Sequence, residues 1–161
     1  MITSELKIAF SGLAGCSELP QVLREIGNAF SQLSEEVLQS HWKWRFEMAT
    51  ALSNSNFLEN KNITAIYLLG SVKNAQSGPC SDIDLMIHTN PDNRCMEEIK
   101  KFLKCWAHCL SEINFSITGE KITEMLDVHF ISDQDVADKN SFTSMIGSHF
   151  NSAKLIKKFG G

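Results

Sequence analysis

The chain has 161 residues, of which 43% are hydrophobic and 21% are charged, and its formal net charge is −4. These values are typical of a single globular domain, and the acidic balance argues against a general nucleic-acid binder, which would usually have a basic surface. No apolar run reaches the ~18 residues needed to cross a bilayer, so we expect no membrane segment, and residues 1–13 lack the apolar core of a secretory signal.

The first 60 residues have a helical pattern. Apolar residues at intervals of three and four predict a helix that starts at Pro20 and ends near Leu33. Ser34, followed by two glutamates, predicts the cap of a second helix that runs to about Ser53. On this second helix, Trp42 and Trp44 could stack on a base and Arg45 could bind phosphate. We favour a Trp42 buried in the core and an Arg45 on the surface.

The remaining residues alternate between strand and helix patterns. Residues 63–69 form an apolar, β-rich run that predicts a buried strand. Further along the chain the patterns predict a loop at 70–81, a strand at 82–88, a helix from 91 to about 113, a short strand at 115–117, a strand at 125–131, a helix through 142–150 and a short end segment at 155–156. This order predicts an α/β (α+β) fold, with a small mixed β-sheet packed by helices.

The five cysteines are expected to be reduced thiols, because their number is odd and they form no dense framework. This favours a cytoplasmic location. Cys105 and Cys109 lie one helical turn apart around His108, but no second Cys/His pair has zinc-ligand spacing. We therefore expect these cysteines to be small apolar residues of the core rather than metal ligands.

The segment that connects the first two predicted strands carries the most chemical information. Asp82 and Asp84 are two residues apart on a strand, so their carboxylates point to the same face, where they repel each other. A folded protein accepts such a pair when a cation lies between them. Gly70 and Ser71, in the turn after the preceding strand, offer backbone N–H groups and a hydroxyl to phosphate oxygens. Together these residues predict a site for Mg²⁺ and a nucleoside triphosphate.

This arrangement resembles the nucleotidyltransferase superfamily related to DNA polymerase beta. That family has an apolar strand, a Gly-Ser turn, a loop of about ten residues and an Asp-x-Asp pair at the start of the next strand. The residues that match are Gly70, Ser71, Ser81, Asp82 and Asp84. The family also uses a third carboxylate on a later strand, for which Asp127 is the candidate.

The resemblance implies a palm-type sheet in a nucleotidyltransferase core at residues 61–161. Residues 1–60 would then be an N-terminal helical extension packed on that core, within a single domain overall. These helices could support a homodimer or bind a partner protein.

The resemblance also implies roles for the site residues. Asp82 and Asp84 would hold the nucleotide-bound Mg²⁺, or Mn²⁺ in its place. Asp127 would help to bind a second ion and would act as base toward the acceptor hydroxyl. Gly70 and Ser71 would hold the β- and γ-phosphates. The nucleotide-binding set would also include Ser81 and Lys73, although a solvated Lys73 is an equal alternative.

Three residues near the motif leave alternatives open. Many small members of the family have an arginine and a second glycine where this chain has Asn74 and Ala75. His129 lies on the same strand face as Asp127 and could orient that carboxylate or the acceptor, but we favour a structural histidine. His88 ends its strand without a predicted role.

The leading hypothesis is a metal-dependent nucleotidyltransferase that moves a nucleoside monophosphate, AMP from ATP, onto a hydroxyl of a small molecule or protein. The alternative is an antitoxin-like or regulatory protein-binding module with weak or no catalysis, which the departures at Asn74 and Ala75 motivate. A large exposed apolar face on the N-terminal helices would favour this alternative. Template-independent extension of nucleic-acid ends is a third hypothesis, which the acidic charge disfavours.

Overall fold

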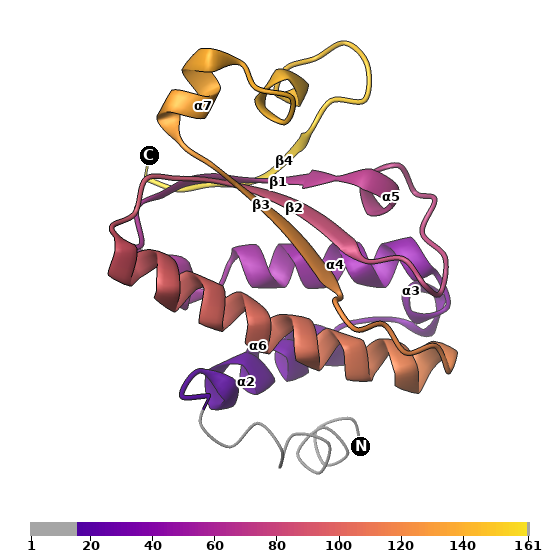
Figure 1. Ribbon diagram of the computed structural model, residues 1–161. Helices are drawn as coiled ribbons and strands as arrows, with labels where there is room; N and C mark the ends of the chain where they lie inside the picture. The colour runs from indigo at the N-terminus through magenta and orange to yellow at the C-terminus, as the bar shows by residue number, and fades with distance from the viewer. Residues whose placement is uncertain (1–15, 161) are drawn as a thin grey trace.

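The computed structural model describes residues 16–160, and the expectations for residues 1–15 lie outside the described residues. Four strands form one sheet, and the long helices lie together on one of its faces (Figure 1). The elements in chain order are α2 (Leu19–Ser31), α3 (Glu35–Leu38), α4 (His41–Ser53), η2 (Asn56–Leu58), β1 (Ile63–Leu69), α5 (Gly70–Lys73), β2 (Ile83–Thr89), α6 (Asn93–Thr118), β3 (Leu126–Ile131), α7 (Asp133–Asp138), η3 (Thr143–Met145) and β4 (Lys154–Lys158).

The sheet has the strand order β3-β2-β1-β4. β1 pairs antiparallel with both β2 and β4, whereas β2 and β3 are parallel. The parallel pair is joined by α6, because a parallel connection needs a long crossover and α6 supplies it. The predicted mixed sheet packed by helices is therefore confirmed.

One face of the sheet packs against α2, α4 and α6 and forms the main core. The strands alternate, so the odd-numbered residues of β2 and the even-numbered residues of β3 point to this side. Residues from α2 and α4 share this core with residues from the sheet and α6. The helices before residue 60 therefore form a layer that packs directly on the sheet. The boundary at residue 60 itself stays a prediction. The largest fully buried side chains include Trp44, Trp106, Phe102, Ile26, Met48 and Leu52.

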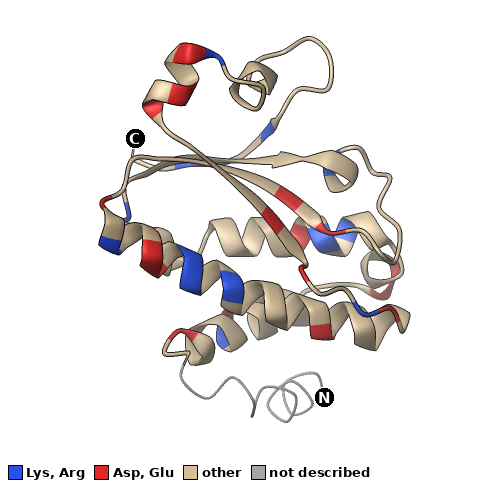
Figure 2. Ribbon diagram, viewed as in Figure 1, with Lys and Arg blue, Asp and Glu red and all other residues tan. Residues whose placement is uncertain are grey.

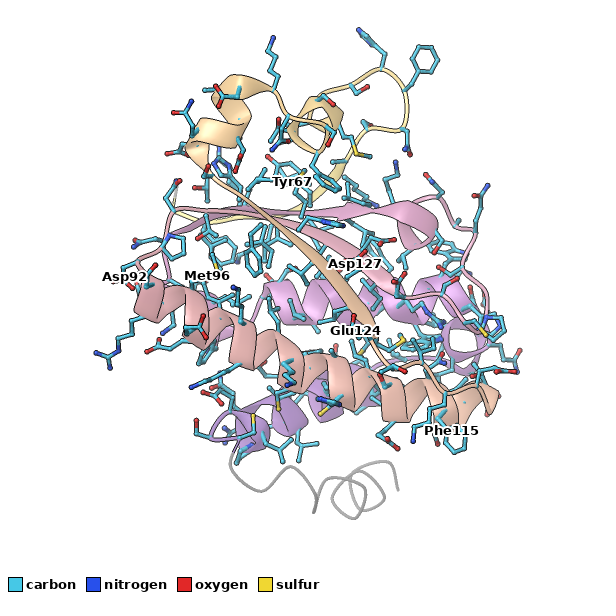
Figure 3. All side chains as sticks on the ribbon, viewed as in Figure 1. Tyr67, Asp92, Met96, Phe115, Glu124 and Asp127 are labelled. Atoms are coloured by element: carbon cyan, nitrogen blue, oxygen red, sulfur yellow. The ribbon has the colours of Figure 1, made fainter. Side chains whose placement is uncertain are left out.

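The other face carries a smaller apolar cluster. Leu69, Met86 and Ile131 are buried there, and Tyr67 and Met145 pack against them. The segment 133–153, with α7 and η3, crosses this face before the chain returns to the sheet as β4 (Figure 1). Figure 3 shows Tyr67 on the side of this segment, whereas Met96 lies on the side of α6.

The predicted helix from 34 to 53 is two helices. Ser34 caps α3 as predicted, since its hydroxyl accepts a hydrogen bond from the N–H of Val37. The chain then leaves the helical region at Ser40, whose extended backbone starts α4. This break turns α4 so that Trp44 is fully buried and Trp42 only partly buried, contrary to the expectation for Trp42.

Two predictions for the second half of the chain were wrong. Residues 115–117 lie in the last turn of α6, which ends at Thr118 and is capped by Gly119, whose φ is 77°. Phe115 and Ile117 have strand propensity, but they are exposed and continue the helix that the buried residues before them form. The helix predicted through Phe142 to Phe150 is replaced by the short η3 and a loop, because Gly147 and Asn151 adopt positive φ angles that end a helix.

The predicted end segment is the strand β4, which adds to β1. Ser132 caps α7 in a capping box with Asp135.

A search of the described helices found none with the length and apolar composition needed to span a membrane.

Candidate active site

Two of the three predicted carboxylates, those of Asp84 and Asp127, lie on the sheet face opposite the long helices. Asp84 of β2 and Asp127 of β3 are directly paired in the parallel register. The residues on either side of each aspartate in its strand point into the main core, so both carboxylates turn to the other face. Asp82 immediately precedes β2, two residues before Asp84. Figure 2 shows acidic residues on the neighbouring strands β2 and β3, and Figure 3 marks Asp127.

The electrostatics of these carboxylates show their proximity. Burial, followed by the charges of Asp82 and Asp127, raises the pKa of Asp84 from 3.8 to about 6. Burial and the charge of Asp127 also raise the pKa of Asp82, while the charge of Arg45 opposes that shift. The charged forms of Asp82 and Asp84 are therefore destabilised by burial and by the neighbouring carboxylates. A bound cation would reverse this effect.

One group of side chains in the described part of the chain has the spacing of a metal site. Asp84, Asp127 and His129 each offer a ligand atom, and these atoms all lie within 4.8 Å of one another. Asp84 and Asp127 are among the predicted ligands, whereas the predicted ligand Asp82 is not in this group and His129 is expected to be structural. Carboxylate oxygens are the protein ligands that Mg²⁺ prefers, so the chemistry of the donor set fits a divalent cation.

The close approach of the backbone to Asp84 requires a glycine at position 70. Its φ is 65°, and a Cβ built on it would lie only 2.0 Å from Oδ2 of Asp84. A side chain at position 70 would thus collide with the carboxylate and would strain the backbone. The Gly-Ser turn and the Asp-x-Asp strand are in contact, as the spacing of the motif predicts. The predicted loop starts as the short helix α5 rather than as irregular chain.

The other predicted nucleotide-binding residues have partners within the protein. The hydroxyl of Ser71 lies 3.2 Å from that of Ser77, within the turn. The hydroxyl of Ser81 accepts a hydrogen bond from the N–H of Gly78. Lys73 donates to Oδ1 of Asn151 at 2.7 Å and to the carbonyl of Ser152 at 2.9 Å. The structure thus brings Gly70 to the carboxylates and attaches Lys73 to the loop 148–152.

Arg45 is a second residue of α4, after Trp42, whose position differs from the expected one. It is fully buried, not on the surface, and burial lowers the pKa of its guanidinium to about 10. It donates to the carbonyls of His41, Pro79 and Ser81 and to the side chain of Asn114. Two of these carbonyls belong to the loop that leads into Asp82. The spacing contained a signal, because Arg45 lies four and seven residues before the buried Ala49 and Leu52.

His88 also has a partner that the sequence analysis did not predict. Its Nε2 lies 2.7 Å from Oδ1 of Asp133 at the start of α7. Together with a hydrogen bond from the N–H of Asp133 to Asn90, this contact fixes α7 to the end of β2. His88 therefore connects elements and does not take part in the carboxylate cluster.

Comparison with known families agrees with this site. The family model described as Polymerase beta, Nucleotidyltransferase matches residues 54–156, which is more than half of the chain and includes Gly70, Ser71 and all three carboxylates. The protein belongs to this nucleotidyltransferase family. Searches of curated proteins and of solved structures gave no match.

Proposed function

We propose that the protein is an active metal-dependent nucleotidyltransferase, which transfers AMP from ATP to a hydroxyl of a small molecule or protein. The observation that carries this proposal is the register of β2 and β3, which pairs Asp84 with Asp127 next to Asp82 and the Gly70 turn. We infer that these three carboxylates form the acidic set of a nucleotidyl-transfer site.

We assign Asp82 and Asp84 to the ion that accompanies the nucleotide, with Mg²⁺ or Mn²⁺ in that position. Asp127 would contribute to a second ion position. Divalent ions bound there would stabilise the charge on the attacking and leaving oxygens of an in-line displacement.

In the proposed reaction the acceptor hydroxyl oxygen forms a bond to the α-phosphorus, and the bond between that phosphorus and the pyrophosphate oxygen breaks. We assign Asp127 as the base that takes the hydroxyl proton. Its side chain is 52% exposed, so an acceptor can approach it from solvent.

We assign the phosphates to the turn that begins with Gly70 and Ser71. The bare Cα of Gly70 lets the backbone lie against Asp84, so phosphates bound to the turn would be held beside the carboxylates. Ser81 and Lys73 complete the proposed set. Ser81 would act through the loop that its hydroxyl closes, and Lys73 would exchange its contacts with the loop 148–152 for a phosphate.

The alternative, a protein-binding module without catalysis, has less support. Its expected feature was a large exposed apolar face on the N-terminal helices. Within residues 16–160, the large exposed apolar side chains all lie beyond residue 114, outside those helices. They are Phe115, Ile117, Phe142, Phe150 and Leu155.

A thermal-shift titration with each NTP, with and without Mg²⁺, tests this proposal. A ligand that binds only the folded state raises the melting temperature by mass action. We expect a Mg²⁺-dependent shift with ATP in the wild type and its loss in Asp82→Asn and Asp84→Asn. The control is Asp138→Asn, which removes an exposed acid from α7. Full nucleotide affinity in the double variant Asp82→Asn/Asp84→Asn would overturn the assignment of the site.

Measurements of pyrophosphate release and of label transfer then distinguish a nucleotidyltransferase from a regulatory protein-binding module. Label from the α-phosphate of ATP should appear on an acceptor, and label from the γ-phosphate should not. Nucleotide binding without pyrophosphate release across a panel of hydroxyl acceptors would favour the regulatory module. No shift with any nucleotide would remove the enzymatic proposal.

A further inference from the structure

His129 lies among the candidate metal ligands rather than in the core. The alternation of β3 places its imidazole on the same face as Asp127, two residues earlier. Its Nε2 is 3.5 Å from Oδ2 of Asp127, and one ligand atom of each of these residues lies within 4.8 Å of one from Asp84. Ligand atoms around a single ion with bonds of about 2.1 Å are ~3–4 Å apart. A small inward shift would bring all three onto one ion.

The imidazole is held in place by stacking. The ring of Phe142 lies against it, with centroids 4.2 Å apart and an interplanar angle of 23°. This contact fixes the plane of the ring without using either nitrogen. The 3.5 Å separation from Asp127 is longer than a charge-assisted hydrogen bond of about 2.7–2.9 Å, so Nε2 remains available for another partner.

A nitrogen ligand changes which ion the site prefers. Mg²⁺ binds oxygen ligands and retains several waters, whereas first-row transition ions accept imidazole nitrogen together with carboxylates. A set of two carboxylates and one imidazole is therefore better matched to a transition ion such as Mn²⁺. A purely acidic set of the kind expected from the sequence would discriminate less between the two ions, because both accept carboxylate oxygens.

We propose that His129 is a direct ligand, with Asp84 and Asp127, of one divalent ion, and that this ligand makes the position favour Mn²⁺ over Mg²⁺. This inference rests on the proposed function, because it concerns the same site. The competing interpretation is a positioning role, in which His129 and Phe142 only fix the shape of the strand face.

Electron spin-echo spectroscopy of bound Mn²⁺, without nucleotide, distinguishes these roles because it detects a directly coordinated nitrogen. We expect ¹⁴N modulation in the wild type and its loss in His129→Gln. The matched control is His108→Gln, since His108 lies on α6 in a groove against the opposite face of β3. Phe142→Leu removes the stacking ring but keeps the imidazole, and should retain the modulation. Modulation that persists in His129→Gln, or is absent from Mn²⁺-loaded wild type, would overturn the inference.

Calorimetric titration with each ion gives a second measurement. We expect His129→Gln to weaken Mn²⁺ binding about tenfold and to leave Mg²⁺ binding nearly unchanged. An equal loss for both ions would show a structural role and would contradict the inference. If His129→Gln does not fold, ¹⁵N-histidine labelling of the wild type replaces it, and the modulation must then change to that of ¹⁵N.

The two proposals fail in different ways. Binding of Mg²⁺ and ATP that depends on Asp84, with no effect of His129 on the choice of ion, would overturn only the role of His129. Failure of the wild type to bind Mn²⁺, Mg²⁺ and nucleotide would overturn both.

Discussion

Nη2 of Arg45 donates a 2.7 Å hydrogen bond to Oδ1 of Asn114, a residue 69 positions further along the chain. The two side chains also share the carbonyl of Pro79, to which Nδ2 of Asn114 donates at 2.9 Å. Arg45 belongs to α4 and Asn114 to α6, so the two helices together hold the loop that leads into Asp82. The N-terminal helices are thus part of the support of the candidate site, in addition to covering the core.

Replacement of Arg45 by methionine should destabilise the protein. Arg45→Met keeps an apolar stem of similar length but leaves Oδ1 of Asn114 and the carbonyl of Ser81 without their donor. The carbonyl of Pro79 loses one of its two donors and keeps the hydrogen bond from Asn114. Buried acceptors that lose a partner cost about 1–3 kcal/mol each, and relaxation of the loop recovers part of this, so we expect a loss of about 2–4 kcal/mol in the free energy of unfolding. Urea titration measures this value.

Arg24→Met is the matched control, because Arg24 is exposed on α2. It should change the free energy of unfolding by less than about 0.5 kcal/mol. Arg45→Met should also weaken nucleotide binding, since the charge of Arg45 favours the ionised form of Asp82. Equal stabilities of the two arginine variants would show that the buried guanidinium network contributes nothing.

Gly70→Ala should damage both stability and the site. The new Cβ would lie 2.0 Å from Oδ2 of Asp84, and the φ of 65° is unfavourable for alanine. Strain of this kind costs about 1–3 kcal/mol, and the carboxylate must move to relieve the collision. We expect a lower melting temperature together with a loss of the Mg²⁺-dependent ATP shift.

Gly78→Ala is the control for this prediction, since a Cβ at position 78 meets no atom within 4 Å and φ there is not positive. It should keep both stability and nucleotide binding. The double variant Gly70→Ala/Asp84→Ala should recover part of the stability lost by Gly70→Ala, because it removes the colliding carboxylate. Strictly additive effects of the two substitutions would contradict the contact.

The placement of Gly70 beside the Asp-x-Asp strand could be predicted from the sequence, whereas the surroundings of Arg45 could not, for physical reasons. Strand alternation is local, so the spacing of Asp82 and Asp84 determined their common face, and the contact with Gly70 followed from the length of the loop. The burial of Arg45 depends on partners 36 and 69 residues away, which no local pattern contains. The helical spacing between Arg45 and the apolar residues Ala49 and Leu52 is nevertheless visible in the sequence.

The errors after α6 have a similar cause. Phe115 and Ile117 have strand propensity, but they continue α6, whose buried residues reach Asn114 and whose end is capped by Gly119 in the left-handed conformation. The spacing of the apolar residues in 142–150 predicts a helix face, whereas Met145 and Ile146 instead cover the second face of the sheet and Phe150 stays exposed. A local period cannot show which of two sheet faces a segment will cover.

Stability without metal should fall as the pH rises through about 6. Because the folded-state pKa of Asp84 is raised from 3.8 to about 6, the folded protein binds this proton more tightly than the unfolded chain does. This contribution is fully present below pH 3.8 and is lost as pH rises through about 6. Relative to Asp84→Asn, the wild type should lose ~1–2 kcal/mol between pH 4 and pH 7, after allowance for partial solvent screening. Urea titrations in chelator at both pH values measure this difference.

Asp133→Asn is the control for this prediction, because the contribution of Asp133 to stability changes with pH in the opposite direction. Hydrogen bonds from Asn90 and His88 lower the pKa of Asp133, so its contribution is present at neutral pH and is lost as the pH falls. Mg²⁺ should raise the melting temperature of the wild type at pH 7 and should have little effect on Asp84→Asn. A wild type and an Asp84→Asn variant with parallel pH profiles would show that the crowded carboxylates do not affect folding.

Nucleotide binding should release the loop 148–152 through Lys73. The ammonium of Lys73 now donates to Asn151 and Ser152, and if it moves to a phosphate these contacts are lost. We therefore expect MgATP to increase amide hydrogen exchange in this loop of the wild type. Lys73→Met should show the faster exchange before nucleotide is added and should bind MgATP about tenfold more weakly, since it loses one charge-assisted hydrogen bond to phosphate.

Asn151→Ala separates the two roles of Lys73. It removes one contact of the loop but leaves the lysine, so exchange in the loop should rise while the affinity for MgATP stays at the wild-type value or increases. Equal weakening of nucleotide binding in Asn151→Ala and Lys73→Met would mean that the ordered loop, rather than the lysine charge, supports the nucleotide. Slower exchange in the loop of the wild type on addition of MgATP would contradict the movement of Lys73, because it would mean that the contacts with Asn151 and Ser152 persist in the bound state.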